Sequence, residues 1–198
     1  MSGNNNDGET FNWKRCGVKP GEFPLQEPEI LTKAFTNEAG GKKICEIINW
    51  PHYSVIFPLT AGRDAKEMQV IVMQRHMSGV EKIMSCLPAM SFRSCHITPA
   101  DAAIQALFDR TGYAAKEMME IGKIYPDPEH SERRCYVFMA EGCYAEPNKK
   151  PSYVTWMSLE KWLEEIKHGR VRDMASISAT YLALSKLKFP TLKKASDI

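Results

Sequence analysis

The chain has 198 residues, of which 43% are hydrophobic and 25% are charged, with a formal net charge of +2. This composition is that of an ordinary globular domain, and it excludes a chain that is disordered throughout. No stretch approaches the roughly 20 apolar residues that a membrane-spanning helix needs. With 26 basic against 24 acidic residues, charge alone does not indicate nucleic-acid binding. We therefore expect one globular domain that is not in the membrane.

The cysteines and the N-terminus indicate a compartment. Six cysteines are present without a Cys-x-x-Cys pair, which argues against a zinc ribbon or a thioredoxin-like site. Residues 1–10 are polar and rich in Asn and Gly, and they lack the apolar core of a secretory signal. Asp7 and Glu9 precede the first basic residue, which disfavours a mitochondrial transit peptide. We expect a cytoplasmic protein with reduced cysteines and a disordered tail over residues 1–10.

The first half of the chain predicts strands. Residues 29–35 and 42–50 flank a Gly-rich turn and predict a hairpin. Residues 52–60 and 67–75 are rich in β-branched, aromatic or other apolar side chains and predict two further strands. Because the connection between these two strands is short, we expect them to pair antiparallel with each other.

A helix follows, with clear signals at both ends. Thr98 suits the N-cap, Pro99 the first helical position and Asp101 the first turn. Gly112 supplies the left-handed residue that closes a helix. These signals predict a helix over residues 98–111.

Strands, a loop and two helices complete the chain. We expect strands at 120–125, 134–141 and 152–157, a polar loop at 126–133, and helices at 158–169 and 173–188. Strands, a helix, strands and two helices in this order predict an α+β fold, with a mixed sheet and segregated helices, or an α/β/α sandwich. A doubly wound parallel sheet is disfavoured.

Three segments share their order and spacing with one known family. They are CLPA at residues 86–89, TPADAAIQALFDRTGY at 98–113 and YPDPEHSERRCYVFMAEG at 125–142. Together they resemble the Nudix superfamily, and within it the ADP-ribose and ADP-sugar pyrophosphatases. The corresponding family patterns are PAG, a helix ending E-E-T-G-Y, and P-G-x-S. Residues 70–74 and 155–183 extend the resemblance.

The resemblance implies a domain plan and a reaction. It implies a Nudix-type domain at residues 51–190, N-terminal strands at 11–50 that contact ligand or a second subunit, and a tail at 191–198. Its relatives pair through such strands, so a homodimer is expected. They hydrolyse diphosphates with Mg²⁺ or Mn²⁺ bound to carboxylates of the helix. No cofactor is expected here, except Mg²⁺ if the protein is active.

The metal-binding acids of the family are largely missing. Anchored on the closing glycine, the family pattern places its two terminal acids at Asp109 and Arg110 and its Arg-Glu pair at Gln105 and Ala106; its early Glu falls on Ile97. Positions 106, 109 and 110 share one helix face, which we expect to line the cleft. Asp109 beside a cation is a poor magnesium site. Arg110 could instead hold a diphosphate by bidentate contact, or it could be a solvated helix charge.

Other candidate residues lie in loops and strand ends. Glu129, His130 and Glu132 occupy the loop that matches P-G-x-S, where they could act as acids or bases or form an exposed charged loop. The remaining ligand-binding candidates are His96 and Arg93 before the helix N-terminus, Gln74 at the strand position of the family's glutamine, and Trp50 for stacking on a nucleobase. A basic stretch at 186–194 could contact RNA or be a frayed helix end.

Three hypotheses remain open from the sequence. The first is a Nudix-like protein that binds a nucleoside-diphosphate ligand, an RNA end or a protein partner with little or no hydrolysis. The second is an active pyrophosphohydrolase of ADP-ribose-like substrates that uses Asp109, Glu129 and Glu132 as substitute catalytic acids. The third is a scaffold without a ligand. The missing carboxylates at 97, 106 and 110 favour the first.

Overall fold

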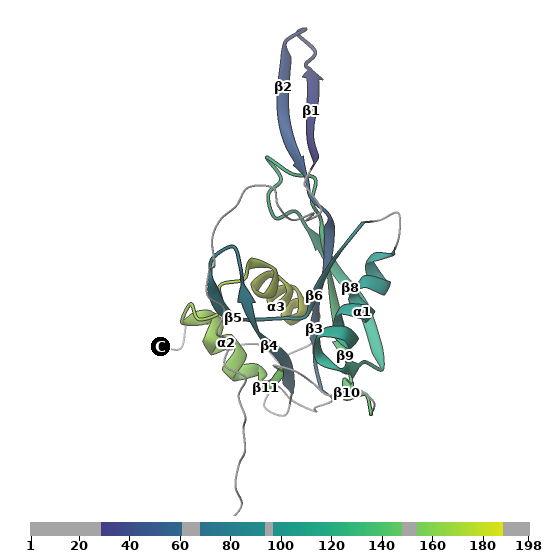
Figure 1. Ribbon diagram of the computed structural model, residues 1–198, viewed down its shortest axis with the longest axis vertical. Coiled ribbons are helices and arrows are strands. Elements are labelled where there is room, and N and C mark those ends of the chain that lie inside the picture. Colours follow the sequence, from purple (N-terminus) through teal and green to yellow (C-terminus); the bar gives the residue numbers. More distant parts are fainter. Residues whose placement is uncertain (1–28, 61–67, 94–96, 148–153, 188–198) are drawn as a thin grey trace, which may run out of the picture.

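The computed structural model describes residues 29–60, 68–93, 97–147 and 154–187, and Figure 1 shows its α+β architecture. The N-terminal tail and the C-terminal tail expected from the sequence lie outside these ranges. The elements are β1 (Glu29–Thr36), β2 (Lys42–Asn49), β3 (His52–Pro58), β4 (Gln69–Met77), β5 (Lys82–Cys86), β6 (Ala89–Phe92), α1 (Pro99–Thr111), β7 (Tyr113–Ala114), β8 (Glu117–Ile124), β9 (Cys135–Glu141), β10 (Tyr144–Ala145), β11 (Val154–Ser158), α2 (Leu159–Lys167) and α3 (Met174–Lys186).

The predicted N-terminal hairpin is confirmed. β1 and β2 pair antiparallel along their whole length, from Glu29 opposite Asn49 to Thr36 opposite Lys42. Gly40 in the turn has φ of 80°, a backbone conformation that glycine adopts at little cost. The hairpin projects from the body of the molecule as an arm (Figure 1).

Two larger sheets form the body, and they correct one prediction. Their strand orders are β6-β3-β9-β8 and β11-β4-β5, and the parallel pair β3–β9 makes the first sheet mixed. β3 and β4 do not form the expected antiparallel pair, because β6 and β9 occupy both edges of β3. The two strands meet only at an antiparallel bridge between Leu59 and Val70.

The capping signals of α1 are confirmed in detail. The Thr98 side chain accepts a hydrogen bond from the Asp101 backbone N–H at 3.1 Å. Gly112 closes the helix with φ of 73°, and its N–H donates to the Phe108 carbonyl. The two C-terminal helices also begin at capping residues, Ser158 for α2 and Asp173 for α3.

Helices cover the four-stranded sheet from both sides. α3 packs against β3, β8 and β9, and α1 packs against β3, β6 and β9. Two apolar clusters result, one centred on Phe57 and Trp162 and the other on Ile56, Leu107 and Phe138. This is the layered α+β arrangement that the sequence predicted. None of the helices in the described ranges combines the length and apolar character that crossing a bilayer requires.

Candidate functional site

A cavity of about 390 Å³ is lined by side chains from both large sheets and from α1 and α3. Its charged lining residues are Arg75 of β4, Arg110 of α1, Arg133 from the loop before β9, and Asp173 at the start of α3. Tyr53 of β3 and Cys86 of β5 also line it. Segments far apart in the sequence therefore bring three guanidinium groups to one cavity.

Arg133 is held in place by its surroundings. Its Nε donates to the Pro51 carbonyl at 3.0 Å, and its Nη2 lies 3.5 Å from the Ser91 Oγ. Its guanidinium carbon stands 4.5 Å from the centre of the Tyr53 ring, a distance typical of a cation–π contact. The charge of Arg133 is thus fixed at the cavity wall before any ligand arrives.

Arg75 and Arg110 are exposed and keep their donors available. Within the part of the chain that the structure describes, neither side chain has an ion pair or a hydrogen bond. A guanidinium presents five N–H donors in a planar fork that matches carboxylate and phosphate oxygens. Arg133 uses some of its N–H donors in contacts within the protein, whereas Arg75 and Arg110 keep theirs available for an anion.

The acid of the cavity belongs to the N-terminus of α3. Asp173 Oδ2 accepts hydrogen bonds from the backbone N–H of Ser176 at 3.0 Å and from its hydroxyl at 2.5 Å. The Ser176 hydroxyl oxygen in turn accepts from the Leu87 N–H at 2.9 Å. The carboxylate is therefore anchored to both α3 and the end of β5.

The thiol in the cavity is unsuited to nucleophilic chemistry. Burial, with the Asp173 charge adding to it and the Arg75 charge opposing it, raises the pKa of Cys86 to about 11. Burial is also the main cause that raises the pKa of Tyr53. Because the thiolate is the reactive form, the raised pKa of Cys86 disfavours nucleophilic chemistry by this thiol at neutral pH.

The donor set on α1 does not fit a divalent cation. Ala106 does not face a cleft as the sequence suggested; it is fully buried in the second apolar cluster. Asp109 and Arg110 are both exposed. In the described ranges, no group of three or more His, Cys, Asp or Glu side chains is placed to hold a metal ion. One carboxylate beside a guanidinium lacks the oxygen ligands that Mg²⁺ or Mn²⁺ takes in proteins.

The acids predicted in the 126–133 loop lie at the base of the hairpin. Glu132 forms an ion pair with Lys33 of β1, which lowers the pKa of Glu132. His130 contacts Asp127 at 3.0 Å, and Glu129 is exposed. None of these side chains lines the arginine cavity. The loop instead supports the hairpin.

The other predicted ligand-binding residues are scattered. Gln74 is exposed, and its Nε2 donates to the Ser85 Oγ at 2.9 Å. Trp50 is 40% exposed just after the hairpin. Arg93 is half-buried after β6, and His96 lies outside the described residues. Of the predicted site residues that the structure describes, Arg110 is the one that lines the cavity.

Sequence reasoning missed Arg75, Arg133, Tyr53 and Asp173. Arg75 directly follows Gln74 in β4, and successive side chains of a strand lie on opposite faces. The face that carries Arg75 is therefore the one opposite Gln74. Arg133 stands in a charged run that is typical of a solvated loop, and Asp173 had a sufficient role as a helix cap. Arg75 was the most accessible of these signals, because its neighbour Gln74 was already a predicted ligand-binding residue.

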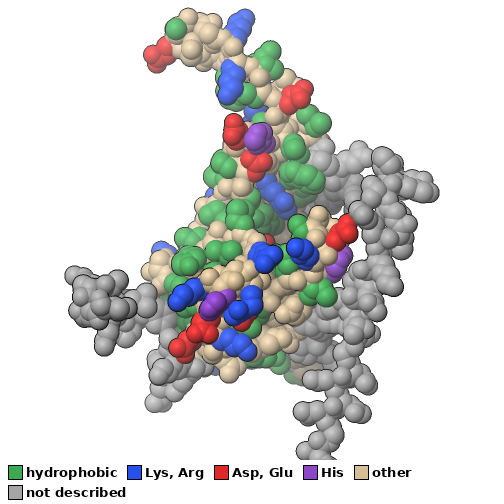
Figure 2. Space-filling view, turned by 90° about the vertical axis from the view of Figure 1, so that its left-hand side faces the viewer, with side chains coloured by type: hydrophobic (Ala, Val, Ile, Leu, Met, Phe, Trp, Pro, Cys, Tyr) green, Lys and Arg blue, Asp and Glu red, His purple; other side chains and the backbone are tan. Residues whose placement is uncertain are grey.

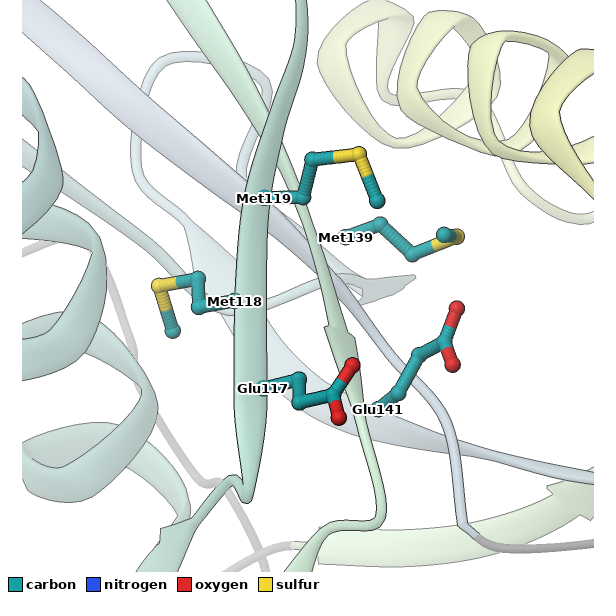
Figure 3. A pocket seen from close by; sticks show the side chains of 5 residues that line it. All are labelled: Glu117, Met118, Met119, Met139 and Glu141. Carbon is teal, nitrogen blue, oxygen red and sulfur yellow. The ribbon is translucent and has the colours of Figure 1, made fainter.

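A second hollow, of about 310 Å³, lies on β8 and β9. Glu117 stands opposite Glu141 and Met119 opposite Met139 across the two strands. Figure 3 shows these four side chains on one side of the strands and Met118 on the other. Carboxylates and thioethers are acceptors without N–H or O–H donors at neutral pH. The hollow therefore does not match a phosphate ligand.

Exposed apolar side chains gather on the hairpin. The five exposed large ones in β1, β2 and the residue after β2 are Ile30, Phe35, Ile44, Ile48 and Trp50. Figure 2 shows apolar side chains along the projecting arm, and basic and acidic side chains interspersed over the body below it. On this face the charges do not form the single-sign patch that characterises nucleic-acid binding.

No protein-family model matches the sequence, and neither does any curated protein. Solved structures do match. One is the crystal structure of an ADP compounds hydrolase, which aligns with a TM-score of 0.59 over 83% of this chain and 96% of that chain. The fold is Nudix-like. At 15% identity the likeness concerns the Nudix-like backbone, and the chemistry of the cavity has to be argued from its own side chains.

Proposed function

We propose that the protein binds a nucleoside-diphosphate ligand in the arginine-lined cavity and hydrolyses it slowly or not at all. The observation that carries the proposal is the convergence of Arg75, Arg110 and Arg133 on one cavity, where Arg110 stands in place of an acid of the family pattern. The Nudix-like fold and the similar ADP compounds hydrolase support the choice of a diphosphate.

The charges of the cavity favour binding without metal. A diphosphate needs its negative charge neutralised, and in Nudix hydrolases metal ions held by carboxylates do so. Here guanidinium groups supply the positive charge directly. Arginine binds phosphate oxygens with two parallel hydrogen bonds, and such charge-assisted bonds are roughly twice as strong as neutral ones.

Hydrolysis needs an activated water as well as a bound ligand. Water is activated by a metal ion or by a base within hydrogen-bond reach. Glu129 and Glu132 were the substitute acids expected from the sequence, and they lie outside the cavity lining. Asp109 is also absent from that lining. Asp173 is the carboxylate that does line the cavity, and no group of metal-binding side chains stands beside it in the described ranges. The arrangement therefore supports a binding protein over a pyrophosphohydrolase.

The test is calorimetric titration of ADP-ribose and ADP in EDTA, followed by a hydrolysis assay with Mg²⁺ or Mn²⁺. We expect binding without metal, and binding weaker by about tenfold or more for each of Arg75→Ala and Arg110→Ala, since one charge-assisted bond is worth about 1.5–3 kcal/mol. The matched control is Arg134→Ala, an exposed arginine outside the cavity lining, which should bind normally. Metal-dependent turnover near 1 per second, abolished by Asp109→Asn, would contradict the proposal.

We also infer that the hairpin β1–β2 is the surface through which two copies associate. Ile30, Ile44 and Ile48 are exposed, and the register places Ile30 opposite Ile48 and Ala34 opposite Ile44. Because directly opposed and alternate residues share a face of a hairpin, the three isoleucines form one apolar stripe. An apolar stripe of this kind favours burial in a partner.

A further inference from the structure

The arginine cavity contains an acid whose presence a simple anion site does not explain. Asp173 is the acidic residue among the described residues that line it. A site that bound phosphate alone would gain affinity without a carboxylate, because like charges repel. Capping accounts for the position of Asp173 and for one of its oxygens, and Ser, Thr and Asn cap about as well, so the carboxylate also gives the cavity an acceptor that capping does not require.

The geometry leaves half of this carboxylate available to a ligand. Oδ2 accepts both hydrogen bonds from Ser176. Oδ1 has no hydrogen-bond partner within the described residues, and the three arginines are not in ion-pair contact with it there. The charge of Asp173 nevertheless acts inside the cavity: it opposes that of Arg75 at Cys86 and that of Arg133 at Tyr53.

An ionised carboxylate only accepts hydrogen bonds, and an ionised phosphate offers it none. The group that Asp173 complements must therefore donate, as a hydroxyl or an ammonium does. Three guanidinium groups in the same cavity repel an ammonium, whereas a hydroxyl is neutral. We propose that Asp173 binds sugar hydroxyls through Oδ1, so that the site selects sugar phosphates and Asp173 determines that specificity. This rests on the proposed phosphate site, and the volume of about 390 Å³ is in the range of small-molecule pockets.

The test compares three probes by calorimetric titration in EDTA: inorganic pyrophosphate, ribose 5-phosphate, and butyl phosphate, which has the phosphate without the hydroxyls. The wild-type protein should prefer ribose 5-phosphate over butyl phosphate by about tenfold, the value of one charge-assisted hydrogen bond. Asp173→Asn retains a good helix cap and removes the charge. It should reduce the preference to about threefold or less and bind pyrophosphate severalfold more tightly.

The matched control is Asp101→Asn, the same change in the first turn of α1, which should leave all three affinities unchanged. Asp173→Ser, which also caps, gives a second variant if the first is unstable by circular dichroism. An unchanged preference or equal weakening of all three probes would overturn the inference alone. Phosphoethanolamine is titrated as a fourth probe, and its binding more tightly than ribose 5-phosphate would do the same. Failure of the wild type to bind any probe would overturn the proposed function and the inference with it.

Discussion

Ala106 and Arg110 lie one turn apart on α1 and differ completely in environment. Ala106 is buried in the apolar cluster that also contains Ile56 and Leu107, whereas Arg110 is exposed at the cavity. An acid introduced at the first position would be desolvated without a partner, and an acid at the second would remain solvated. Introducing metal-binding acids on this helix is therefore more than a change of charge.

We predict that Ala106→Glu lowers the free energy of unfolding by about 3 kcal/mol or more, through overpacking and an unpaired buried carboxylate. Gln105→Glu changes the exposed neighbour and serves as the control, with an effect within about 0.5 kcal/mol. Denaturant unfolding followed by circular dichroism measures both. Equal stability of the two variants would show that Ala106 is not in the core.

Three buried thiols predict a loss of stability in alkali. Burial raises the pKa of Cys86 to about 11 and those of Cys135 and Cys143 to about 12. These pKa values in the folded protein exceed the value of 9.0 in the unfolded chain. The protonated thiols therefore contribute fully to the free energy of unfolding below pH 9, and this contribution is lost as the pH rises toward 11. In that range each thiol lowers the free energy of unfolding by about 1.4 kcal/mol per pH unit.

The measurement is the melting temperature between pH 8 and 10.5, together with iodoacetamide labelling read by mass spectrometry. We expect a falling melting temperature above pH 9, and we expect Cys86, Cys135 and Cys143 to be labelled at pH 7.5 only after denaturation. Rapid labelling of the three thiols in the folded protein would contradict the buried environment described above.

At the scale of elements, Trp162 connects the two C-terminal helices. It is fully buried, and its Nε1 donates to the Thr180 Oγ1 at 2.9 Å, joining α2 to α3. The same α3 begins with Asp173 at the cavity. Packing between the helices therefore supports the position of a proposed ligand-binding group.

We predict that Trp162→Phe lowers the free energy of unfolding by about 2–3 kcal/mol, because it removes buried volume and a buried hydrogen bond. Trp156→Phe is the matched control: that indole also donates a 2.9 Å bond, to the Tyr113 hydroxyl, but its residue is 38% exposed. Its loss should stay below about 1 kcal/mol. A larger loss for Trp156→Phe in thermal or urea unfolding would reverse our assessment of the two sites.

Local signals predicted elements well because each needs only neighbouring residues. Thr98 and Gly112 define α1 through contacts within a few positions. Strand pairing depends instead on partners that are distant in the sequence. β3 pairs with β6 and β9 and not with β4, and no local sequence pattern predicts that pairing. The cavity has the same difficulty, since Arg75, Arg110 and Arg133 come from three separate segments.

At the scale of the whole molecule, the arm predicts the oligomeric state. We expect a dimer by light scattering at tens of micromolar, and a monomer after Ile30→Lys with Ile44→Lys, because two charges in an apolar contact oppose association. Ile104→Lys, at an exposed position of α1, is the control and should remain dimeric. A monomeric wild type would contradict the role that we infer for the hairpin.

The base of the arm and the wall of the cavity are held by one serine. The Ser131 hydroxyl donates to the Ile48 carbonyl of β2 at 2.8 Å and accepts from the Arg133 N–H at 3.1 Å. If ligand and partner each bias this segment toward one conformation, the two equilibria are thermodynamically linked. If dimerisation then changes the ligand affinity by some factor, ligand binding must change the dimer association constant by the same factor.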